Sequence, residues 1–157
     1  MSPSLPSEQN YRIRKATDFD IPALIMIEQA TQAAPWSEDV FKRCLTAGYD
    51  CWILEEKPHT LIGFIMLSMG SIHEAHILNL GIDPAFQGKG WGRCLLEHVL
   101  MDAKQQGIRM IYLEVRRSNQ RAIHLYQQMG FVQVGERKNY YPAGLEREDA
   151  LVLVKNI

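Results

Sequence analysis

Glycine occupies every second position in one stretch of the chain, Gln87-Gly88-Lys89-Gly90-Trp91-Gly92-Arg93. Because glycine has no Cβ, the backbone there can approach a ligand closely and direct several N–H groups the same way. The stretch follows an apolar, strand-like run and opens an amphipathic helical pattern, so a helix macrodipole adds positive partial charge at this point. These features predict a site for phosphate or pyrophosphate. The alternative is a glycine-rich turn that only makes room between a strand and a helix.

The spacing of the glycines excludes two common phosphate loops. The P-loop pattern GxxxxGK[ST] is absent, because Lys89 lies between glycines and no Ser or Thr follows a Gly-Lys pair. The dinucleotide pattern GxGxxG fails as well, since Arg93 stands where its third glycine belongs. The remaining pattern, Q-x-x-G-x-G, comprises Gln87, Gly90 and Gly92, and it resembles the pyrophosphate loop of the GCN5-related N-acetyltransferases, which bind acetyl-coenzyme A.

Glu114 is the most informative charged residue, because it lies between Leu113 and Val115 in the strand-like run RMIYLEVR. A carboxylate is disfavoured in the middle of a strand unless its face is solvated or functional. One interpretation is a solvent-facing glutamate on an edge strand. The other is a general base whose pKa is adjusted by partial burial.

Tyr126 lies in a short helical pattern whose apolar neighbours would bury its ring. It is either a core tyrosine with a hydrogen-bonded hydroxyl or a proton donor to a leaving group. Asn119 precedes the same helix and is either a plain N-cap or a cap that also touches ligand.

Three further aromatic residues are candidates for binding a peptide. Tyr140 and Tyr141 are adjacent in a polar segment near the end of the chain, where exposed aromatic rings favour a contact function. Trp36 precedes a helix start in the sequence APWS, and it is either a core anchor or a ligand contact.

Neither the cysteines nor the histidines form a recognisable reactive or metal-binding pattern. Cys44, Cys51 and Cys94 contain no CxxC pair, so we expect neither a disulfide framework nor a zinc site. Cys94 lies near the glycine stretch, but no basic partner stands at useful spacing, which favours packing over acyl transfer. The five histidines show no HxxxH or HExxH spacing, and we expect no metal.

The composition indicates a soluble globular protein. The 157 residues suit one domain, with residues 1–10 as a flexible tail and 11–157 as the folded part. A net charge of −1 gives no global basic field for nucleic acid. No apolar run is long enough to span a membrane, and no signal core is evident, so we expect a cytoplasmic protein with no nucleic-acid or membrane partner.

Hydrophobic periodicity predicts the elements that position these residues. Strands are predicted at 11–15, 49–55, 60–69, 74–83, 109–116, 131–136 and 149–155, the last two around a polar loop. Helices are predicted from Thr17, from Ser37, after the glycine stretch and after Ser118 or Asn119. Short turns between early strands and one strand–helix–strand crossover predict a single α/β (or α+β) domain with a mixed, mostly antiparallel sheet flanked by helices.

The resemblance to the GCN5-related N-acetyltransferases extends to other segments. It is strongest to the subfamily that acetylates the N-terminal alanine of a small-subunit ribosomal protein. The segments that carry it are Gln87 to Arg93, Leu113-Glu114-Val115-Arg116, Ser118-Asn119, Ala122-Ile123-His124-Leu125-Tyr126, Gly130-Phe131, Asn139-Tyr140-Tyr141-Pro142 and Arg147-Glu148-Asp149-Ala150. This sequence departs from the subfamily at Leu145-Glu146, where a glycine commonly precedes the last of these segments. It also departs at Gly81, where alanine is common.

The resemblance implies a role for each matching residue. Glu114 would be the general base and Tyr126 the general acid, with Trp36, Tyr140 and Tyr141 in the peptide groove. The residues expected to contact acetyl-coenzyme A are Leu80, Gly81, Ile82, Gln87, Gly88, Lys89, Gly90, Trp91, Gly92, Arg93, Asn119 and Tyr126. The implied reaction is direct acetyl transfer in a ternary complex. The alternatives are an acetyltransferase for small amines or other peptide N-termini, and a non-catalytic acyl-coenzyme A or nucleotide-binding module.

Overall fold

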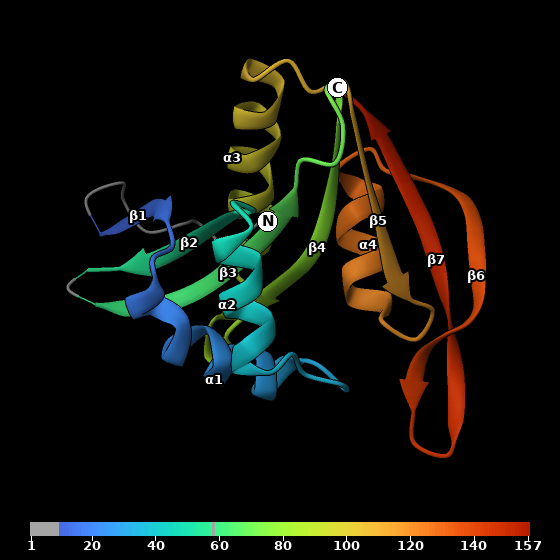
Figure 1. Cartoon of the computed structure of the whole chain (residues 1–157), viewed down its shortest axis with the longest axis horizontal. Helices are drawn as coiled ribbons and strands as arrows, with labels where there is room; N and C mark the ends of the chain where they lie inside the picture. Colours follow the sequence, from blue (N-terminus) through green and yellow to red (C-terminus); the bar gives the residue numbers. More distant parts are fainter. Residues whose placement is uncertain (1–9, 58) are drawn as a thin grey trace. The chain divides into compact units, whose positions relative to one another are not determined.

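The computed structural model describes residues 10–57 and 59–157, so all but the last residue of the predicted tail lies outside the described part. The strands follow the order β1-β2-β3-β4-β5-β7-β6 (Figure 1). The elements are β1 (Tyr11–Lys15), η1 (Asp18–Asp20), α1 (Ile21–Thr31), α2 (Glu38–Thr46), β2 (Asp50–Glu56), β3 (Thr60–Ser68), β4 (Glu74–Ile82), η2 (Pro84–Phe86), α3 (Trp91–Gln105), β5 (Met110–Arg116), α4 (Gln120–Gln128), β6 (Val132–Ala143) and β7 (Glu146–Asn156). Every strand and helix that periodicity predicted is present.

The chain divides into two compact units. The first comprises the described part of Met1–Leu67 together with Asn79–Val99, and the second comprises Ser68–Leu78 with Leu100–Ile157. Strand β4 and helix α3 each contribute residues to both units.

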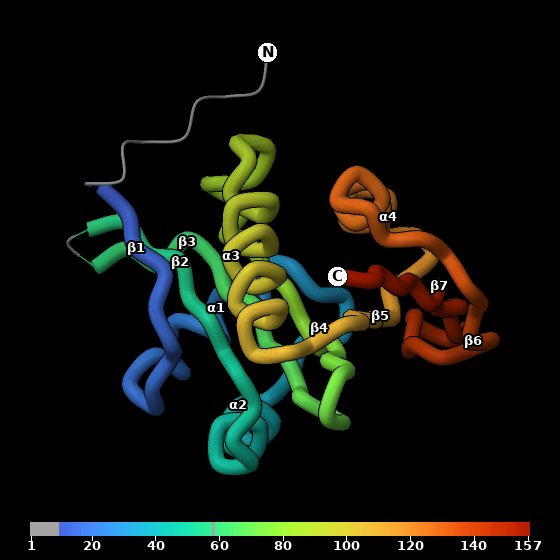
Figure 2. The backbone as a smooth tube through the Cα atoms, turned by 90° about the horizontal axis from the view of Figure 1, so that it is seen from above, coloured from blue at the N-terminus to red at the C-terminus, as the bar shows by residue number. Residues whose placement is uncertain are grey.

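In the first unit, helices pack on both faces of the strands. Strands β1, β2 and β3 pair antiparallel in chain order. On one face, the ring of Phe41 in α2 lies 5.7 Å from that of Phe64 in β3, and α1 lies beside α2 (Figure 2). On the other face, α3 packs through Trp91 onto Tyr11, with ring centroids 5.1 Å apart. Alternation of side chains along each strand produces these two apolar faces.

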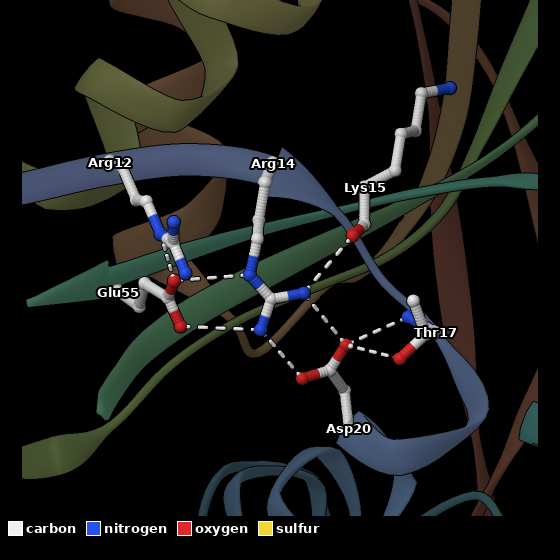
Figure 3. A network of polar contacts seen from close by, with 6 residues as sticks. All are labelled: Arg12, Arg14, Lys15, Thr17, Asp20 and Glu55. Atoms are coloured by element: carbon white, nitrogen blue, oxygen red, sulfur yellow. Dashed lines mark hydrogen bonds and ion pairs between the residues drawn. The ribbon is translucent and has the colours of Figure 1, made fainter. Parts of the chain in front are cut away.

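A network of charged side chains fixes the start of this unit (Figure 3). The guanidinium of Arg14 donates to both carboxylate oxygens of Asp20, at 2.8 and 3.0 Å, and to Oε1 of Glu55 at 3.0 Å. Arg12 also pairs with Glu55, and the Thr17 amide donates to Asp20 at 2.7 Å. The network therefore joins β1, β2 and the turn that precedes α1.

The second unit contains a parallel strand pair, as the crossover predicted. Strand β4 pairs with β5 from Glu74↔Met110 to Ile77↔Leu113, and β7 pairs antiparallel with β5 on its other side. The strand alternation of β5 buries Ile111, Leu113 and Val115.

The predicted polar loop between the last two strands is wrong, because those strands are longer than their apolar cores. Strands β6 and β7 extend to Ala143 and from Glu146, so Gly144 and Leu145 alone join them. Arg147 donates to the carbonyl oxygens of Asn139 and Tyr140 at 2.7 and 2.9 Å, which holds the polar part of the hairpin together. The pairing is irregular between Arg137 and Tyr141, where Asn139 adopts a φ of 53°.

Candidate active site

The glycine stretch forms the turn into the N-terminus of α3. Gly88 and Gly90 have φ values of 77° and 88°, a region that glycine enters without strain. The side-chain amide of Gln87 donates to the carbonyl oxygen of Ile82 at 2.9 Å, which ties the turn to the end of β4. The first N–H groups of a helix have no intrahelical partner. The turn therefore has the features of an anion-binding site at a helix N-terminus.

Three larger side chains of the stretch have different surroundings. The indole of Trp91 is buried at 3% exposure, so its side chain packs against Tyr11 and only its backbone remains for a ligand. Arg93 is exposed and pairs with Glu97 at 3.0 Å, and the exposed Lys89 ammonium lies 5.8 Å from the Phe86 ring. Two cations therefore stand beside the turn.

The end of β4 explains why this chain has glycine at position 81. A Cβ on Gly81 would lie 2.9 Å from Cε1 of Phe64 and 3.1 Å from Cγ2 of Ile27. Leu80 and Ile82 flank this contact, and their carbonyl oxygens accept hydrogen bonds from Gln32 and Gln87.

Trp36 is held in place by a buried carboxylate that the sequence did not reveal. Oε2 of Glu28 accepts the Trp36 backbone N–H at 2.9 Å, and Oε1 accepts Nδ2 of Asn79 at 2.8 Å. Burial raises the pKa of Glu28 despite these two hydrogen bonds. The Trp36 ring is half-buried and lies 5.4 Å from the ring of the buried Phe41, so Trp36 packs against the core as the first interpretation expected. Its contact with a peptide stays a prediction.

Glu114 is neither solvent-facing nor on an edge strand, so that alternative is wrong. Strand β5 lies between β4 and β7, and the Glu114 side chain is 7% exposed. Its Oε2 lies 2.5 Å from Nε2 of His76, and its Oε1 lies 3.3 Å from Nε of Arg137. The hydrogen bond with His76 lowers the pKa of Glu114, and Arg137 acts in the same direction, although burial opposes both.

His76 and Arg137 are the functional candidates that sequence reasoning missed. A partial signal exists, because His76 alternates with the buried Ala75 and Ile77 as Glu114 alternates with Leu113 and Val115. Only the register between β4 and β5 shows that His76 and Glu114 are close enough to form a hydrogen bond.

Tyr126 lies in α4 of the second unit, and Asn119 is the N-cap residue that precedes this helix. The Tyr126 residue is 5% exposed, and its ring lies 5.5 Å from that of Phe131. Burial raises the pKa of Tyr126, so the hydroxyl is protonated at neutral pH and can donate. Oδ1 of Asn119 accepts the Ala122 N–H at 3.2 Å, which confirms the N-cap.

Tyr140 and Tyr141 lie within strand β6 and not in a loop, which corrects the prediction. Their rings are 4.9 Å apart, with the Arg116 guanidinium 4.6 Å from the Tyr141 ring. Burial raises the pKa of Tyr141, and the charge of Glu114 adds to the effect. The second unit thus brings Glu114 and Arg137 together, and the charge of Glu114 contributes to the raised pKa of Tyr141.

The cysteines have the properties of packing residues. Burial raises the pKa of Cys44 and Cys94, and it raises the pKa of Cys51 to about 12. A thiol with a raised pKa is a poor nucleophile. Among residues 10–57 and 59–157 no group of three or more His, Cys, Asp or Glu side chains could hold a metal ion. Nor does a helix in that part of the chain have the length and apolar content to cross a membrane.

Comparison with known proteins defines the class. The family model described as Acetyltransferase (GNAT) family matches residues 17–131. The chain therefore belongs to the GNAT family of acetyltransferases.

The names of individual relatives describe a more specific activity than the family model does. The chain is 37% identical over 134 residues to the [ribosomal protein bS18]-alanine N-acetyltransferase of Escherichia coli K12, covering 85% of this chain and 89% of that one. The corresponding enzyme of Haemophilus influenzae is 37% identical over 140 residues, covering 88% and 92%.

Solved structures confirm the predicted fold class. The crystal structure of the Escherichia coli ribosomal-protein-S18-alanine N-acetyltransferase matches with a TM-score of 0.87 and 35% identity, covering 94% of each chain. The structure of Ard1 from Thermoplasma volcanium matches with a TM-score of 0.84 and 25% identity, covering 94% of this chain and 98% of that one.

Proposed function

We propose that this acetyltransferase moves the acetyl group of acetyl-coenzyme A to the α-amino group of an N-terminal alanine, that of a small-subunit ribosomal protein of the S18 type. The observation that carries the proposal is the 37% identity to enzymes of that activity over 85% of the chain. An acceptor on a ribosomal protein would place the enzyme in the cytoplasm, with neither a membrane nor a nucleic acid as its partner.

The chemistry follows from the acceptor's amine. An α-amino group has a pKa of about 8, so much of it is protonated and non-nucleophilic at neutral pH. We assign removal of that proton to the hydrogen-bonded group of side chains built around Glu114. The amine then attacks the acetyl carbon directly, and Tyr126, whose raised pKa keeps its hydroxyl protonated, protonates the departing thiolate. The raised pKa of each cysteine supports a route without an acyl-enzyme.

Backbone groups would hold the coenzyme. The turn from Gly88 to Arg93 would bind the pyrophosphate, and the strand end from Leu80 to Ile82 would lie along the pantetheine arm, where a backbone N–H could polarise the thioester. Trp36, Tyr140 and Tyr141 would contact the peptide.

A panel of acceptors tests the proposal. Peptides that begin with Ala, Ser or Met, one of them the S18 N-terminus, are incubated with acetyl-coenzyme A beside a set of small amines, and intact mass is measured. We expect a gain of one acetyl group on the S18 peptide at the highest kcat/KM. Preferential acetylation of a small amine would favour the alternative activity, and tight binding of ATP or NAD with no coenzyme A binding would refute the proposal.

A further inference from the structure

His76 and Glu114 form a pair that is fixed by strand register. His76 is the register partner of Tyr112 in β5, two residues before Glu114. Side chains two positions apart on a strand share a face, so His76, Tyr112 and Glu114 project together. The imidazole stacks on the Tyr112 ring, with centroids 4.3 Å apart and an interplanar angle of 12°. The ring orientation of His76 is therefore set from two sides.

The hydrogen bond determines which imidazole nitrogen is basic. An ionised carboxylate can only accept a hydrogen bond, so Nε2 of His76, 2.5 Å from Oε2 of Glu114, carries the hydrogen and donates it. In a neutral imidazole the other nitrogen then has the free lone pair. Nδ1 of His76 is thus the nitrogen that can accept a proton from another molecule.

Glu114 itself is poorly suited to take a proton from the amine. His76 engages one of its oxygens and Arg137 lies 3.3 Å from the other, and the hydrogen bond with His76 lowers its pKa. Proton transfer is most efficient when the base has a pKa near the working pH. Imidazole is the side chain most often used as a general base, whereas this carboxylate already has a partner at each of its oxygens. The His76 side chain is also more accessible, at 20% exposure against 7% for Glu114.

We propose that Nδ1 of His76 accepts the proton of the substrate amine, directly or through one water, and that Glu114 is the positioning residue that orients the imidazole and stabilises its charged form. This inference rests on the proposed function and names the atom that deprotonates the amine in the first step of that reaction. The N–H bond of the ammonium breaks as the Nδ1–H bond forms, and the freed lone pair attacks the acetyl carbon. The C–S bond then breaks, Tyr126 protonates the departing thiolate, and the second proton lost by the acetylated nitrogen replaces the one that Tyr126 gave. The imidazolium returns its own proton to solvent. The charged or titratable groups around the pair are Tyr112 in β5 and Arg137 and Tyr141 in β6.

Glutamine at position 76 separates catalysis from positioning. His76→Gln keeps an N–H that can donate to Glu114 but removes the basic nitrogen. For the S18 peptide we expect kcat to fall about 100-fold or more, with the KM for acetyl-coenzyme A unchanged. The loss should shrink as pH rises, because more of the amine is then already deprotonated. His59→Asn, in the turn between β2 and β3, is the matched control and should keep wild-type kinetics.

Wild-type kcat in His76→Gln would overturn the inference, because a merely structural histidine would be replaced by the glutamine donor. A second readout does not depend on activity. Nitrogen-15 spectra of the histidine side chains should show His76 with hydrogen on Nε2, and hydrogen on Nδ1 instead would overturn the inference. If the wild-type enzyme acetylates none of the peptides while His76 shows the Nε2–H form, the proposed function fails and the hydrogen-bonded pair is upheld.

Discussion

Alanine at position 81 would test how tightly the end of β4 is packed. The added Cβ would lie 2.9 Å from Cε1 of Phe64 and 3.1 Å from Cγ2 of Ile27. Non-bonded carbon atoms prefer a separation of about 3.5–4.0 Å, so the methyl group overlaps an aromatic ring. That ring is itself fully buried, at 0% exposure, and has little room to move. Overpacking of this kind costs about 1–3 kcal/mol.

We therefore expect Gly81→Ala to lower the free energy of unfolding in urea by about 1–3 kcal/mol and the melting temperature by about 2–12 °C. Gly135→Ala is the control, because its Cβ would meet nothing within 4 Å, and it should change stability by less than about 0.5 kcal/mol. Adding Phe64→Leu removes the ring edge, so the double variant should lose less than the sum of the two single changes. Unfolding of Gly81→Ala at the wild-type urea midpoint would refute the packing argument.

Three further predictions concern the turn before α3, the stability of the fold at acid pH, and the effect of Glu114 and Tyr126 on turnover. Gly88→Ala places a side chain at a φ of 77°, so the turn of the free enzyme should shift to relieve the strain. Restoring its shape on binding costs about 1–2 kcal/mol, so the acetyl-coenzyme A Kd should rise about tenfold by calorimetry. Hydrogen bonds from Arg14 lower the pKa of Glu55, so this pair stabilises the fold above the unfolded value of about 4.3 and the contribution is lost as pH falls through the folded pKa. Arg14→Gln should move the acid-unfolding midpoint, followed by circular dichroism, to higher pH. Glu114→Gln and Tyr126→Phe should each lower kcat about 100-fold while the acetyl-coenzyme A Kd stays near wild type.

Each of these predictions has a contrary result. Gly144→Ala adds a similar strain at a φ of 63° in the β6–β7 turn, and an equal loss of coenzyme affinity there would contradict a specific role for the turn before α3. An unchanged acid midpoint in Arg14→Gln would remove the charge network from the stability argument. Near-normal turnover in both Glu114→Gln and Tyr126→Phe would exclude these residues from the chemistry.

The elements of the fold were predictable because their signals are local. Alternation buries every second residue of β5, and the helical spacing of Trp91, Leu95 and Val99 identifies α3. The part of the last hairpin nearest its turn, residues 137–148, was not predictable in this way, because the segment around Asn139 is polar. Its strand geometry depends on Arg147 from the opposite strand, a contact that no local pattern contains.

The candidate site was predictable only where one residue type is informative on its own. The glycine turn and Glu114 stand out from their neighbours in sequence. His76 does not, because its importance comes from a partner 38 residues away that the parallel register brings to hydrogen-bonding distance. Glu28 was missed for the same reason, since its partners Trp36 and Asn79 lie in other segments.

Strand β6 stands at one end of the strand order, and its irregularity affects how the protein behaves at high concentration. A regular edge strand offers a row of N–H and C=O groups with which another molecule's strand can pair. In β6 that row is interrupted by the register shift between Arg137 and Tyr141, by the left-handed Asn139 and by Pro142, which has no N–H. Arg137 and Lys138 also place charged side chains on this strand, a common feature of edges that do not pair. The geometry that presents the two tyrosines thus also protects the enzyme against edge-to-edge aggregation.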